Sequence, residues 1–514
     1  MGFLLSTFLV IGIRLVANYL LSDSASPTKV AIYGAGSAGM QLAGALRVSS
    51  EMQPIVFVDS DKSLHNTFIG GLKVLDPKKL RKLALRRKID EVLIAIPSAP
   101  KSTLRALLGQ IEDYSVRVRI LPGLAELASG KISVSELKEI EIKDLLGRLE
   151  VEANVPLLEK NIKGKIVLVT GAGGSIGSEI SRQIAMIGAR RLILLDSNEY
   201  ALYQVKSELE KNFIDVKVIS VIGNVINKKR IFDVFKTLEV DTVFHAAAYK
   251  HVPLVEENPF EGFFNNVIGT KICLEAAIDS GVETFVLIST DKAVRPTNIM
   301  GATKRLAEMI LQSYSTDSQI KLKMTMVRFG NVLGSSGSAI PLFQQQIKDG
   351  GPVTVTHPEV IRYFMSIPEA AELVIQAGAL GKGGDVFVLD MGEPVNIYEL
   401  AKRLITLSGL KLKDETNQDG DIEIIFTGLR PGEKLYEELL IGDNVSTTPH
   451  KQIFRAEEDF IRKEEIEDVI EEIIIASESN DINKYKDLLE KVIQGYTKKD
   501  EIVDILSINE NNIN

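Results

Sequence analysis

The string Ser289-Thr-Asp-Lys292 places a hydroxyl, a carboxyl and an amine on three successive residues directly after an apolar segment. A carboxyl and an amine side by side beneath a bound cofactor can serve as general acid and general base. The alternative is an exposed Asp-Lys pair in a surface turn. Met300 and Lys304 follow on one face of the next predicted helix, because residues four apart share a face. We therefore predict a catalytic group that consists of Thr290, Asp291, Lys292, Met300 and Lys304.

Nicotinamide-dependent dehydrogenase domains usually carry Tyr-x-x-x-Lys one helix after a strand that ends in Ser or Thr. Here Met300 occupies the tyrosine position, and Lys304 remains. The only tyrosine with a lysine four residues later is Tyr398, with Lys402, and this pair lies beyond the nucleotide-binding part on a surface helix. Methionine cannot exchange a proton, so the acid–base work must move to the neighbouring residues at 290–292.

Two glycine turns each stand between a predicted strand and a predicted helix, the context in which glycines bring the backbone close to a pyrophosphate. The second turn has Gly-x-x-Gly-x-x-Gly spacing, and Asp196 stands nineteen residues beyond its last glycine, where a carboxylate accepts from a ribose hydroxyl. No arginine follows Asp196 to receive a 2′-phosphate, which favours NAD over NADP. The predicted cofactor-binding residues here are Gly171, Gly174, Ser175, Ile176, Gly177 and Asp196.

The first turn contains Gly34, Gly36 and Gly39, with Asp59 twenty residues further on. No catalytic constellation follows it. Two interpretations of this turn are therefore equally favoured. It is either a tight turn with packing glycines or an unused site, or it is a second nucleotide-binding site.

Strands that alternate with helices predict parallel sheets, so the fold class is α/β with two Rossmann-like parallel-sheet domains in tandem. Beyond Asn331 the sequence changes to short strands and glycine-rich loops with one helix, Ile397–Gly409, which predicts a smaller C-terminal substrate-binding lobe. The predicted organisation is an apolar helix (1–22), the first domain (28–135), a connector (136–161), the second domain with its lobe (162–455) and an acidic helical tail (456–514).

The composition excludes several classes of protein. The 514 residues are 45% hydrophobic and 25% charged, as in ordinary globular chains. A formal net charge of −9 argues against general nucleic-acid binding, which needs a positive surface. One cysteine and five scattered histidines give no zinc-type ligand spacing, so no metal is expected.

Phe3–Leu21 is mostly apolar and about long enough to span a bilayer, but Arg14 interrupts it. It is either a membrane-associated helix or a helix packed in protein, and we expect membrane association with the catalytic domain on the cytoplasmic face. A basic run at 78–88 favours an anionic leaflet or, alternatively, forms a solvated helix face with Leu80, Leu83 and Leu85 turned inward.

Several strings together resemble the polysaccharide-biosynthesis family of nucleoside-diphosphate-sugar 4,6-dehydratases (CapD/PglF/WbpM type), within the extended short-chain dehydrogenases. The resemblance runs from about residue 154 to 454 and rests on Thr170–Ser178, Ala246–Pro253, Ser289–Lys304, Arg328–Ser335, His357–Met365 and Gly428–Lys434. Long members carry a multi-helix membrane anchor, and Met1 falls where only its last helix would lie.

The resemblance implies a UDP-N-acetylglucosamine 4,6-dehydratase that retains configuration at C5 and regenerates its NAD, acting as a homo-oligomer. It implies that Asp291 is the acid for the departing hydroxyl, Lys292 the base at C5 and Thr290 the partner of the C4 hydroxyl, while Lys304 holds the nicotinamide ribose. Asn224 replaces a usual adenine-contacting Asp, and Ala246 also contacts the cofactor. The implied UDP-sugar contacts are Lys250, Asn331, Arg362, Arg430 and Glu433. For His251, a histidine packed in the core and a histidine that contacts the ligand are equally favoured.

Two other functions fit parts of the pattern. A UDP-sugar 4-epimerase would use the same domain but needs no acid and base at C5 and C6, so the Thr-Asp-Lys string favours dehydration. A non-catalytic nucleotide-sugar sensor in a capsule assembly complex would tolerate loss of Asp291 or Lys304, and both are present.

Overall fold

The structure is a computed structural model that describes residues 27–49, 51–122, 137–140, 153–335, 337–438, 445–498 and 504. The chain divides into two compact units: Met1–Leu145 with Lys402–Glu423, and Leu146–Ala401 with Ile424–Asn514. The predicted N-terminal apolar helix and half of the predicted connector lie outside the described residues. Within the described ranges, no helix is both long enough and apolar enough to cross a membrane.

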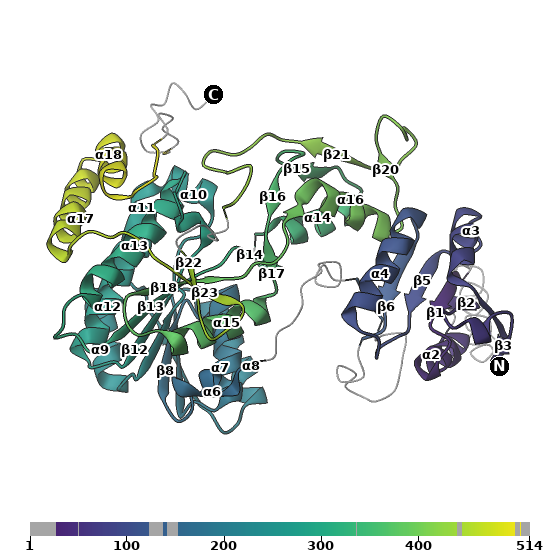
Figure 1. The fold of residues 1–514 in the computed structure, drawn as a ribbon, viewed down its shortest axis with the longest axis horizontal. Helices are drawn as coiled ribbons and strands as arrows, with labels where there is room; N and C mark the ends of the chain where they lie inside the picture. The colour runs from purple at the N-terminus through teal and green to yellow at the C-terminus, as the bar shows by residue number, and fades with distance from the viewer. Residues whose placement is uncertain are drawn as a thin grey trace, which may run out of the picture. The chain divides into compact units, whose positions relative to one another are not determined.

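Unit 1 contains a sheet with strand order β3-β4-β2-β1-β5-β6-β7, in which the five inner strands run parallel (Figure 1). The short edge strand β3 pairs antiparallel with β4, and β7 at the opposite edge pairs antiparallel with β6. The strands are β1 Thr28–Tyr33, β2 Met52–Val58, β3 Phe68–Ile69, β4 Leu72–Leu75, β5 Glu91–Ile94, β6 Arg117–Ile120 and β7 Lys138–Glu139, and the helices are α2 Ser37–Val48, α3 Leu80–Leu85 and α4 Lys101–Ile111.

The first glycine turn connects β1 to α2 and has the geometry of a Rossmann turn. A Cβ on Gly39 would lie 1.9 Å from the carbonyl oxygen of Gly34, so only glycine lets α2 approach the turn this closely. The backbone N–H of Ala35 donates to the carboxylate of Asp59 at 2.7 Å, which ties the turn to the end of β2.

The basic run of unit 1 differs from its prediction at one residue. Leu80 is buried and Leu83 is half-buried, but Leu85 is 65% exposed. The reason is that residues five apart in a helix lie about 140° apart around its axis, so Leu85 points away from the face that carries Leu80.

Unit 2 contains a larger sheet, with order β10-β9-β8-β11-β12-β13-β18-β23-β22. The first seven strands are parallel, and β23 and β22 complete the sheet in antiparallel pairing. The predicted α/β class with two parallel sheets is confirmed. These strands are β8 Ile166–Thr170, β9 Arg191–Asp196, β10 Lys217–Ile222, β11 Thr242–His245, β12 Thr284–Ile288, β13 Lys323–Arg328, β18 Asp385–Leu389, β22 Val445–Thr447 and β23 Ile453–Ala456.

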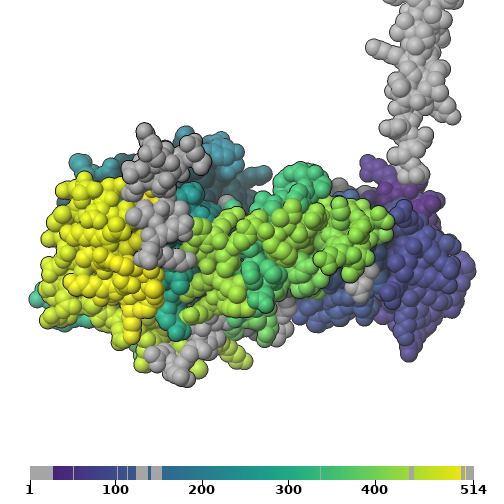
Figure 2. All heavy atoms as spheres, turned by 90° about the horizontal axis from the view of Figure 1, so that it is seen from above, coloured from purple at the N-terminus to yellow at the C-terminus, as the bar shows by residue number. Residues whose placement is uncertain are grey.

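Helices cover both faces of this sheet, so its central strands are buried throughout and read as nearly continuous apolar runs. The helices before the lobe are α6 Val155–Lys160, α7 Ser175–Ile187, α8 Glu199–Asn212, α9 Lys228–Leu238, α10 Val252–Glu257, α11 Pro259–Phe263, α12 Gly269–Asp279 and α13 Ile299–Ser315. After the lobe come α17 Lys463–Glu478 and α18 Ile482–Val492, which lie on the surface of unit 2 in yellow in Figure 2.

The lobe contains more helix than the sequence predicted. Its helices are α14 Ala339–Lys348, α15 Ile367–Leu380 and α16 Ile397–Leu407, and its short strands are β14 Asn331–Val332, β15 Val353–Val355, β16 Ile361–Arg362, β17 Phe364–Met365, β19 Val395–Asn396, β20 Leu412–Lys413 and β21 Ile422–Phe426. Within this stretch, Lys402–Glu423, with most of α16 and all of β20, belongs to unit 1. Only α16 was predicted. α15 packs against the sheet with most of its residues buried, so it lacks the polar stripe that marks a surface helix.

A buried ion cluster joins α13 to the sheet. Arg328 and Glu308 are fully buried, and the guanidinium donates to both carboxylate oxygens at 2.7 and 2.6 Å. Glu458 and Arg305 add further ion pairs, and the hydroxyl of Ser289 donates to Glu308 at 2.6 Å. Burial opposes ionisation of Glu308, but its arginine partners outweigh burial and lower its pKa to about 2. The cluster thus holds the end of β12 in register with α13.

We expect Glu308→Ala to lower the free energy of unfolding by about 3–5 kcal/mol, because the buried Arg328 loses both hydrogen bonds to Glu308 and, among the described residues, keeps only Glu458 as an ion-pair partner. Urea unfolding of the purified protein measures this change. Glu471→Ala, on the exposed face of α17, is the matched control and should change stability by less than about 0.5 kcal/mol. Equal stabilities of the two variants would contradict this account of the cluster.

Candidate active site

A cavity of about 1240 Å³ lies in unit 2, where the carboxyl ends of the parallel strands meet the lobe. Open α/β sheets bind their ligands at this edge. Of the residues predicted for the site, the cavity is lined by Gly171, Gly174, Ser175, Ile176, Gly177, Ala246, Lys250, Thr290, Lys292, Met300, Lys304, Asn331, Arg362, Arg430 and Glu433. Asp196, Asn224 and Asp291 are not among the lining residues.

The second glycine turn forms one end of the cavity. A Cβ on Gly177 would lie 2.1 Å from the carbonyl oxygen of Gly171, and one on Gly171 would lie 2.6 Å from the backbone nitrogen of Ala247. Glycine at these positions therefore permits the turn. Gly174 is the N-cap of α7 and makes no side-chain hydrogen bond to the helix. Helix N-termini that follow a glycine turn are common anion-binding positions.

Asp196 ends β9 beside this turn and is half-buried. Its carboxylate accepts from the backbone N–H groups of Gly173 and Asn198, each at 2.8 Å. A carboxylate has about four lone-pair sites, so it can still accept a ribose hydroxyl. Asn224 lies at the end of the next strand, and its side-chain oxygen accepts from the backbone of Ile226 at 3.1 Å. These residues fit the adenosine half of a dinucleotide such as NAD.

A buried asparagine that the sequence did not reveal positions the loop after β11. Asn266 lies in a π-helical turn, Phe264–Ile268, and is 1% exposed. Its side chain accepts from the backbone N–H of Tyr249 at 2.7 Å and donates to the Tyr249 carbonyl at 3.0 Å. Such π-turns are frequent at functional sites, because they redirect a side chain out of the helical register. Lys250 follows directly, and lost solvation in the cavity wall lowers its pKa.

Met300 and Lys304 both reach the cavity from α13, as their spacing predicts. Asn298 caps this helix by accepting from the backbone N–H of Gly301 at 2.7 Å. The Lys304 ammonium donates to the carbonyl oxygen of Ile288 at 2.6 Å. Burial lowers the pKa of Lys304 to about 8, although the nearby Glu308 opposes this shift.

Thr290, Asp291 and Lys292 leave β12 in a single 3₁₀ turn. The Thr290 hydroxyl donates to Asp291 at 2.8 Å, and the Lys292 ammonium lies 3.1 Å from the same oxygen. Asp291 lies behind Thr290 and Lys292, and its second oxygen faces Gly330, where a Cβ would come within 3.0 Å. The carboxyl is therefore one hydrogen bond away from the cavity wall.

Glu437 is a functional candidate that the sequence did not reveal. Its side chain is 5% exposed, and one carboxylate oxygen lies 2.8 Å from the Lys292 ammonium and 3.3 Å from the Arg362 guanidinium. No spacing signal marks it, because its partners lie in distant parts of the chain. It stands only three residues beyond Lys434, the end of the predicted Gly428–Lys434 string.

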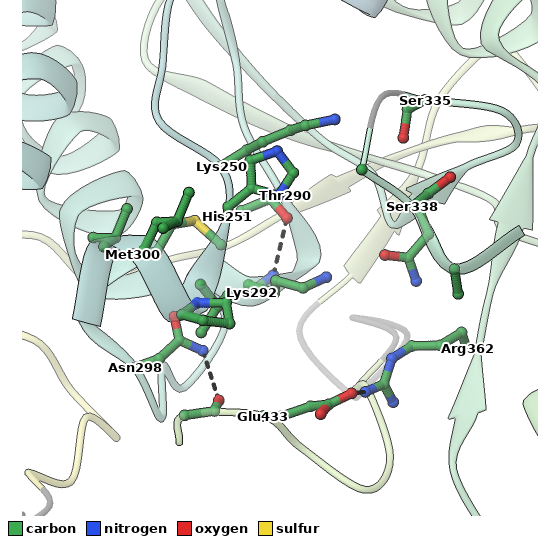
Figure 3. A pocket seen from close by; sticks show the side chains of 18 of the residues that line it. Lys250, His251, Thr290, Lys292, Asn298, Met300, Ser335, Ser338, Arg362 and Glu433 are labelled. Carbon is green, nitrogen blue, oxygen red and sulfur yellow. Dashed lines mark hydrogen bonds and ion pairs between the residues drawn. The ribbon is translucent and has the colours of Figure 1, made fainter. Parts of the chain in front are cut away.

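The loop that carries Arg430, Glu433 and Glu437 is fastened to the start of α13. Asn298 donates to the carbonyl of Gly432 at 3.1 Å, and Lys434 donates to the carbonyl of Arg295 at 3.1 Å. Figure 3 shows Glu433 and Arg362 pointing toward each other across this part of the cavity, with 2.7 Å between carboxylate and guanidinium.

The polar groups left for a ligand come mostly from the lobe. Arg362 is committed to Glu433, Glu437 and two backbone carbonyls, whereas Arg430 is exposed at the cavity. The side-chain nitrogen of Asn331 is buried and has no hydrogen-bond partner among the described residues. His251 is exposed rather than core, and its ring packs over Gly337, where a Cβ would lie 2.5 Å from Cε1.

The remaining sequence hypotheses can be placed as well. Tyr398 begins α16 and packs its ring 5.5 Å from that of Phe426, away from the cavity lining. Among the residues that the structure describes, no cluster of three His, Cys, Asp or Glu residues could hold a metal ion.

This fold and site are those of an α/β protein whose larger unit carries a dinucleotide-type glycine turn beside a cavity. Residues 167–458 match the family described as polysaccharide biosynthesis protein. The chain is 44% identical over 467 residues to the capsular polysaccharide biosynthesis protein CapD of Staphylococcus aureus, covering 90% of this chain and 77% of that protein. The chain therefore belongs to the polysaccharide biosynthesis protein family.

Two further likenesses are to a curated epimerase and to a solved structure. A UDP-glucose 4-epimerase of Rickettsia akari is 35% identical over 288 residues, which are 55% of this chain and 79% of that protein. The X-ray structure of Pen from Bacillus thuringiensis is 33% identical, with a TM-score of 0.51, covering 60% of this chain and 98% of that chain.

Proposed function

We propose that this protein is a nucleotide-sugar 4,6-dehydratase that converts UDP-N-acetylglucosamine to a UDP-4-keto-6-deoxy sugar and retains configuration at C5. One observation carries the proposal. The Thr290-Asp291-Lys292 turn, with Met300 in place of tyrosine, stands at the wall of a cavity whose other end is a dinucleotide-type glycine turn. An epimerase has no need of an acid and a base beside C5 and C6.

NAD, when bound on the glycine turn, would supply oxidation at sugar C4 and reduction at C6. The residues that would hold it are Gly171, Gly174, Ser175, Ile176, Gly177, Asp196, Asn224, Ala246 and Lys304. Lys304 is suited to its role because its ammonium is fixed at 2.6 Å from a backbone carbonyl at the end of β12.

The chain's own residues then move the protons. Thr290, which donates its own hydroxyl hydrogen to Asp291, accepts a hydrogen bond from the C4 hydroxyl, whose proton leaves to solvent. Asp291 keeps its proton until the C6 hydroxyl leaves and is then reprotonated from solvent. Once C4 is a ketone the C5 proton is acidic, and Lys292 removes it. Asp291 supplies, through Thr290, the proton with which the C6 hydroxyl leaves as water. Lys292 finally returns its proton to C5, so the site ends as it began.

Lys292 starts this cycle as an ammonium. Burial alone would favour the neutral amine, but the carboxylates of Asp291 and Glu437 outweigh burial and raise the pKa of Lys292. Lys292 must therefore pass a proton to a neighbouring carboxylate before it accepts one from C5.

Arg430 and Lys250 suit the diphosphate of a UDP-sugar, since both present cations to the cavity. Arginine is well matched to phosphate because its planar fork donates two parallel hydrogen bonds. Incubation with UDP-N-acetylglucosamine tests the proposal. The product should weigh one water less than the substrate. An epimerase, the second candidate because of the Rickettsia akari relative, gives a product of unchanged mass.

We expect the purified protein to carry NAD, because the cofactor is regenerated in every turnover. Asp196→Ala should weaken cofactor binding by about 1–3 kcal/mol, since the ribose hydroxyls lose a charged acceptor. Chromatography of the nucleotide released on denaturation measures occupancy in both proteins. Release of NADP instead of NAD, or equal retention by Asp196→Ala, would overturn this assignment.

A further inference from the structure

The carboxyls of Asp291 and Glu437 form a buried pair around one ammonium. The Lys292 ammonium lies 3.1 Å from Asp291 and 2.8 Å from Glu437, and the two acidic side chains are 8% and 5% exposed. Each carboxyl has a second oxygen that is buried and without a hydrogen-bond partner among the described residues, namely Oδ2 of Asp291 and Oε2 of Glu437. An orphaned buried oxygen is costly, so two in one cluster call for an explanation.

One shared proton explains both orphans. Two adjacent carboxylates around a single ammonium cannot both ionise cheaply in a dry site. If one carboxyl is protonated, its O–H can donate to the other, and both orphaned oxygens gain a partner. The two carboxyls lie close enough for this hydrogen bond.

The surroundings decide where the proton rests. Glu437 has a second cation, the Arg362 guanidinium at 3.3 Å, whereas Asp291 has only Lys292 and the Thr290 hydroxyl. Burial, and next the charge of Glu437, raise the pKa of Asp291 to about 7. Burial opposes ionisation of Glu437, but Lys292 and its other donors lower its pKa to about 2. Glu437 is therefore the anion of the pair.

We propose that Glu437 is a positioning residue for proton transfer, which keeps Asp291 protonated as the resting acid and receives the proton that Lys292 must give up before it acts as a base. The inference rests on the proposed function. The inference adds Glu437 to the proposed mechanism, a residue that belongs neither to the sequence motif nor to the assigned acid and base.

The transfer from Lys292 balances within the cluster. An N–H bond of the ammonium breaks, an O–H bond forms on Glu437, and the neutral amine is free to take the C5 proton. The total charge of Asp291, Lys292 and Glu437 is unchanged. When Lys292 has returned its proton to C5, Glu437 gives the stored proton back to the amine.

The pH dependence of turnover distinguishes this role from a structural one. Asp291 acts as an acid only when protonated, so the activity it supports is present below its pKa and is lost as the pH rises through that value. We expect the alkaline limb of kcat near pH 7 in the unaltered enzyme. In Glu437→Gln the negative charge that disfavours ionisation of Asp291 is gone, so the pKa of Asp291 falls. The alkaline limb of kcat should then move to lower pH by about one unit or more. Glu437→Asp, which keeps the charge, should restore most of the shift.

Glu433→Gln is the matched control, because Glu433 also pairs with Arg362, at 2.7 Å, but among the described residues forms no ion pair or hydrogen bond with Asp291 or Lys292. It should change KM for the UDP-sugar and leave the limb in place. Infrared titration of the NAD-loaded protein gives a readout that needs no turnover. A buried carboxylic acid should titrate near pH 7 in the unaltered enzyme, at lower pH in Glu437→Gln, and not at all in Asp291→Asn.

The possible outcomes distinguish failure of the proposed function from failure of the role assigned to Glu437. If the unaltered enzyme removes no water from UDP-N-acetylglucosamine, the proposed function fails. If it does, but Glu437→Gln keeps both the alkaline limb and the infrared titration, the role of Glu437 is refuted. If Glu437→Gln does not fold, infrared titration of the unaltered enzyme and of Asp291→Asn tests the assignment instead. A buried carboxylic acid that still titrates near pH 7 in Asp291→Asn would contradict it.

Discussion

Lys292→Ala is expected to lower the turnover of UDP-N-acetylglucosamine by about 10²–10⁴-fold, the usual effect of losing a general base. In the proposed mechanism the Lys292 amine at the cavity wall takes the C5 proton, and alanine leaves no substitute at that position. Bound NAD and the affinity for the UDP-sugar should survive nearly intact, because Lys292 contacts neither the glycine turn nor Arg430 in the structure. Steady-state kinetics and nucleotide release measure these quantities.

Lys292→Arg is the control that separates a base from a structural cation. A guanidinium can occupy the space between Asp291 and Glu437 and keep the charge, but it does not lose its proton in proteins. Its turnover should stay as low as that of Lys292→Ala. Recovery of activity in Lys292→Arg, or near-normal turnover in Lys292→Ala, would assign the C5 proton transfer to water or to another residue.

Asp291→Asn is the second large effect, and we expect a similar loss of about 10²–10⁴-fold in product formation. Asparagine has nearly the shape of aspartate and can accept from Thr290, but it cannot supply the proton with which the C6 hydroxyl leaves. Oxidation at C4 and removal of the C5 proton remain possible. Substrate recovered from D₂O should therefore contain deuterium at C5 although little water has been lost.

Met300→Tyr provides a check on this assignment. A phenol at position 300 would point toward C4 from α13, whereas the missing proton is needed at C6. It should not rescue Asp291→Asn. Rapid product formation by the double variant, or recovered substrate without deuterium, would contradict the separation of roles between Asp291 and Lys292.

The local parts of the site follow from the sequence because their signals are local. The glycines of the second turn are needed where the backbone comes within 2.1–2.6 Å of a would-be Cβ, and this requirement is visible as spacing. Met300 and Lys304 share a helix face by helical period alone. The strands of the second sheet are continuous apolar runs, so their alternation with helices, and with it the parallel sheet, could be predicted.

The missed parts depend on distant contacts. Glu437 matters because the fold carries its loop to Lys292, and Asn266 because a π-turn aims it at Tyr249. Asp291 was predicted to face the reacting atoms, and the structure places it behind Thr290, because the 3₁₀ turn after β12 directs it toward Gly330. α15 escaped prediction because it is buried on most sides, which removes the polar stripe that identifies a helix.

The most direct test of dehydration by the Thr290-Asp291-Lys292 turn is the reaction of the unaltered enzyme with UDP-N-acetylglucosamine in D₂O. The product should lack one water, carry one deuterium at C5 and retain the configuration of that carbon, as mass spectrometry and proton NMR would show. A product of unchanged mass, or a dehydrated product with hydrogen at C5, would contradict the account.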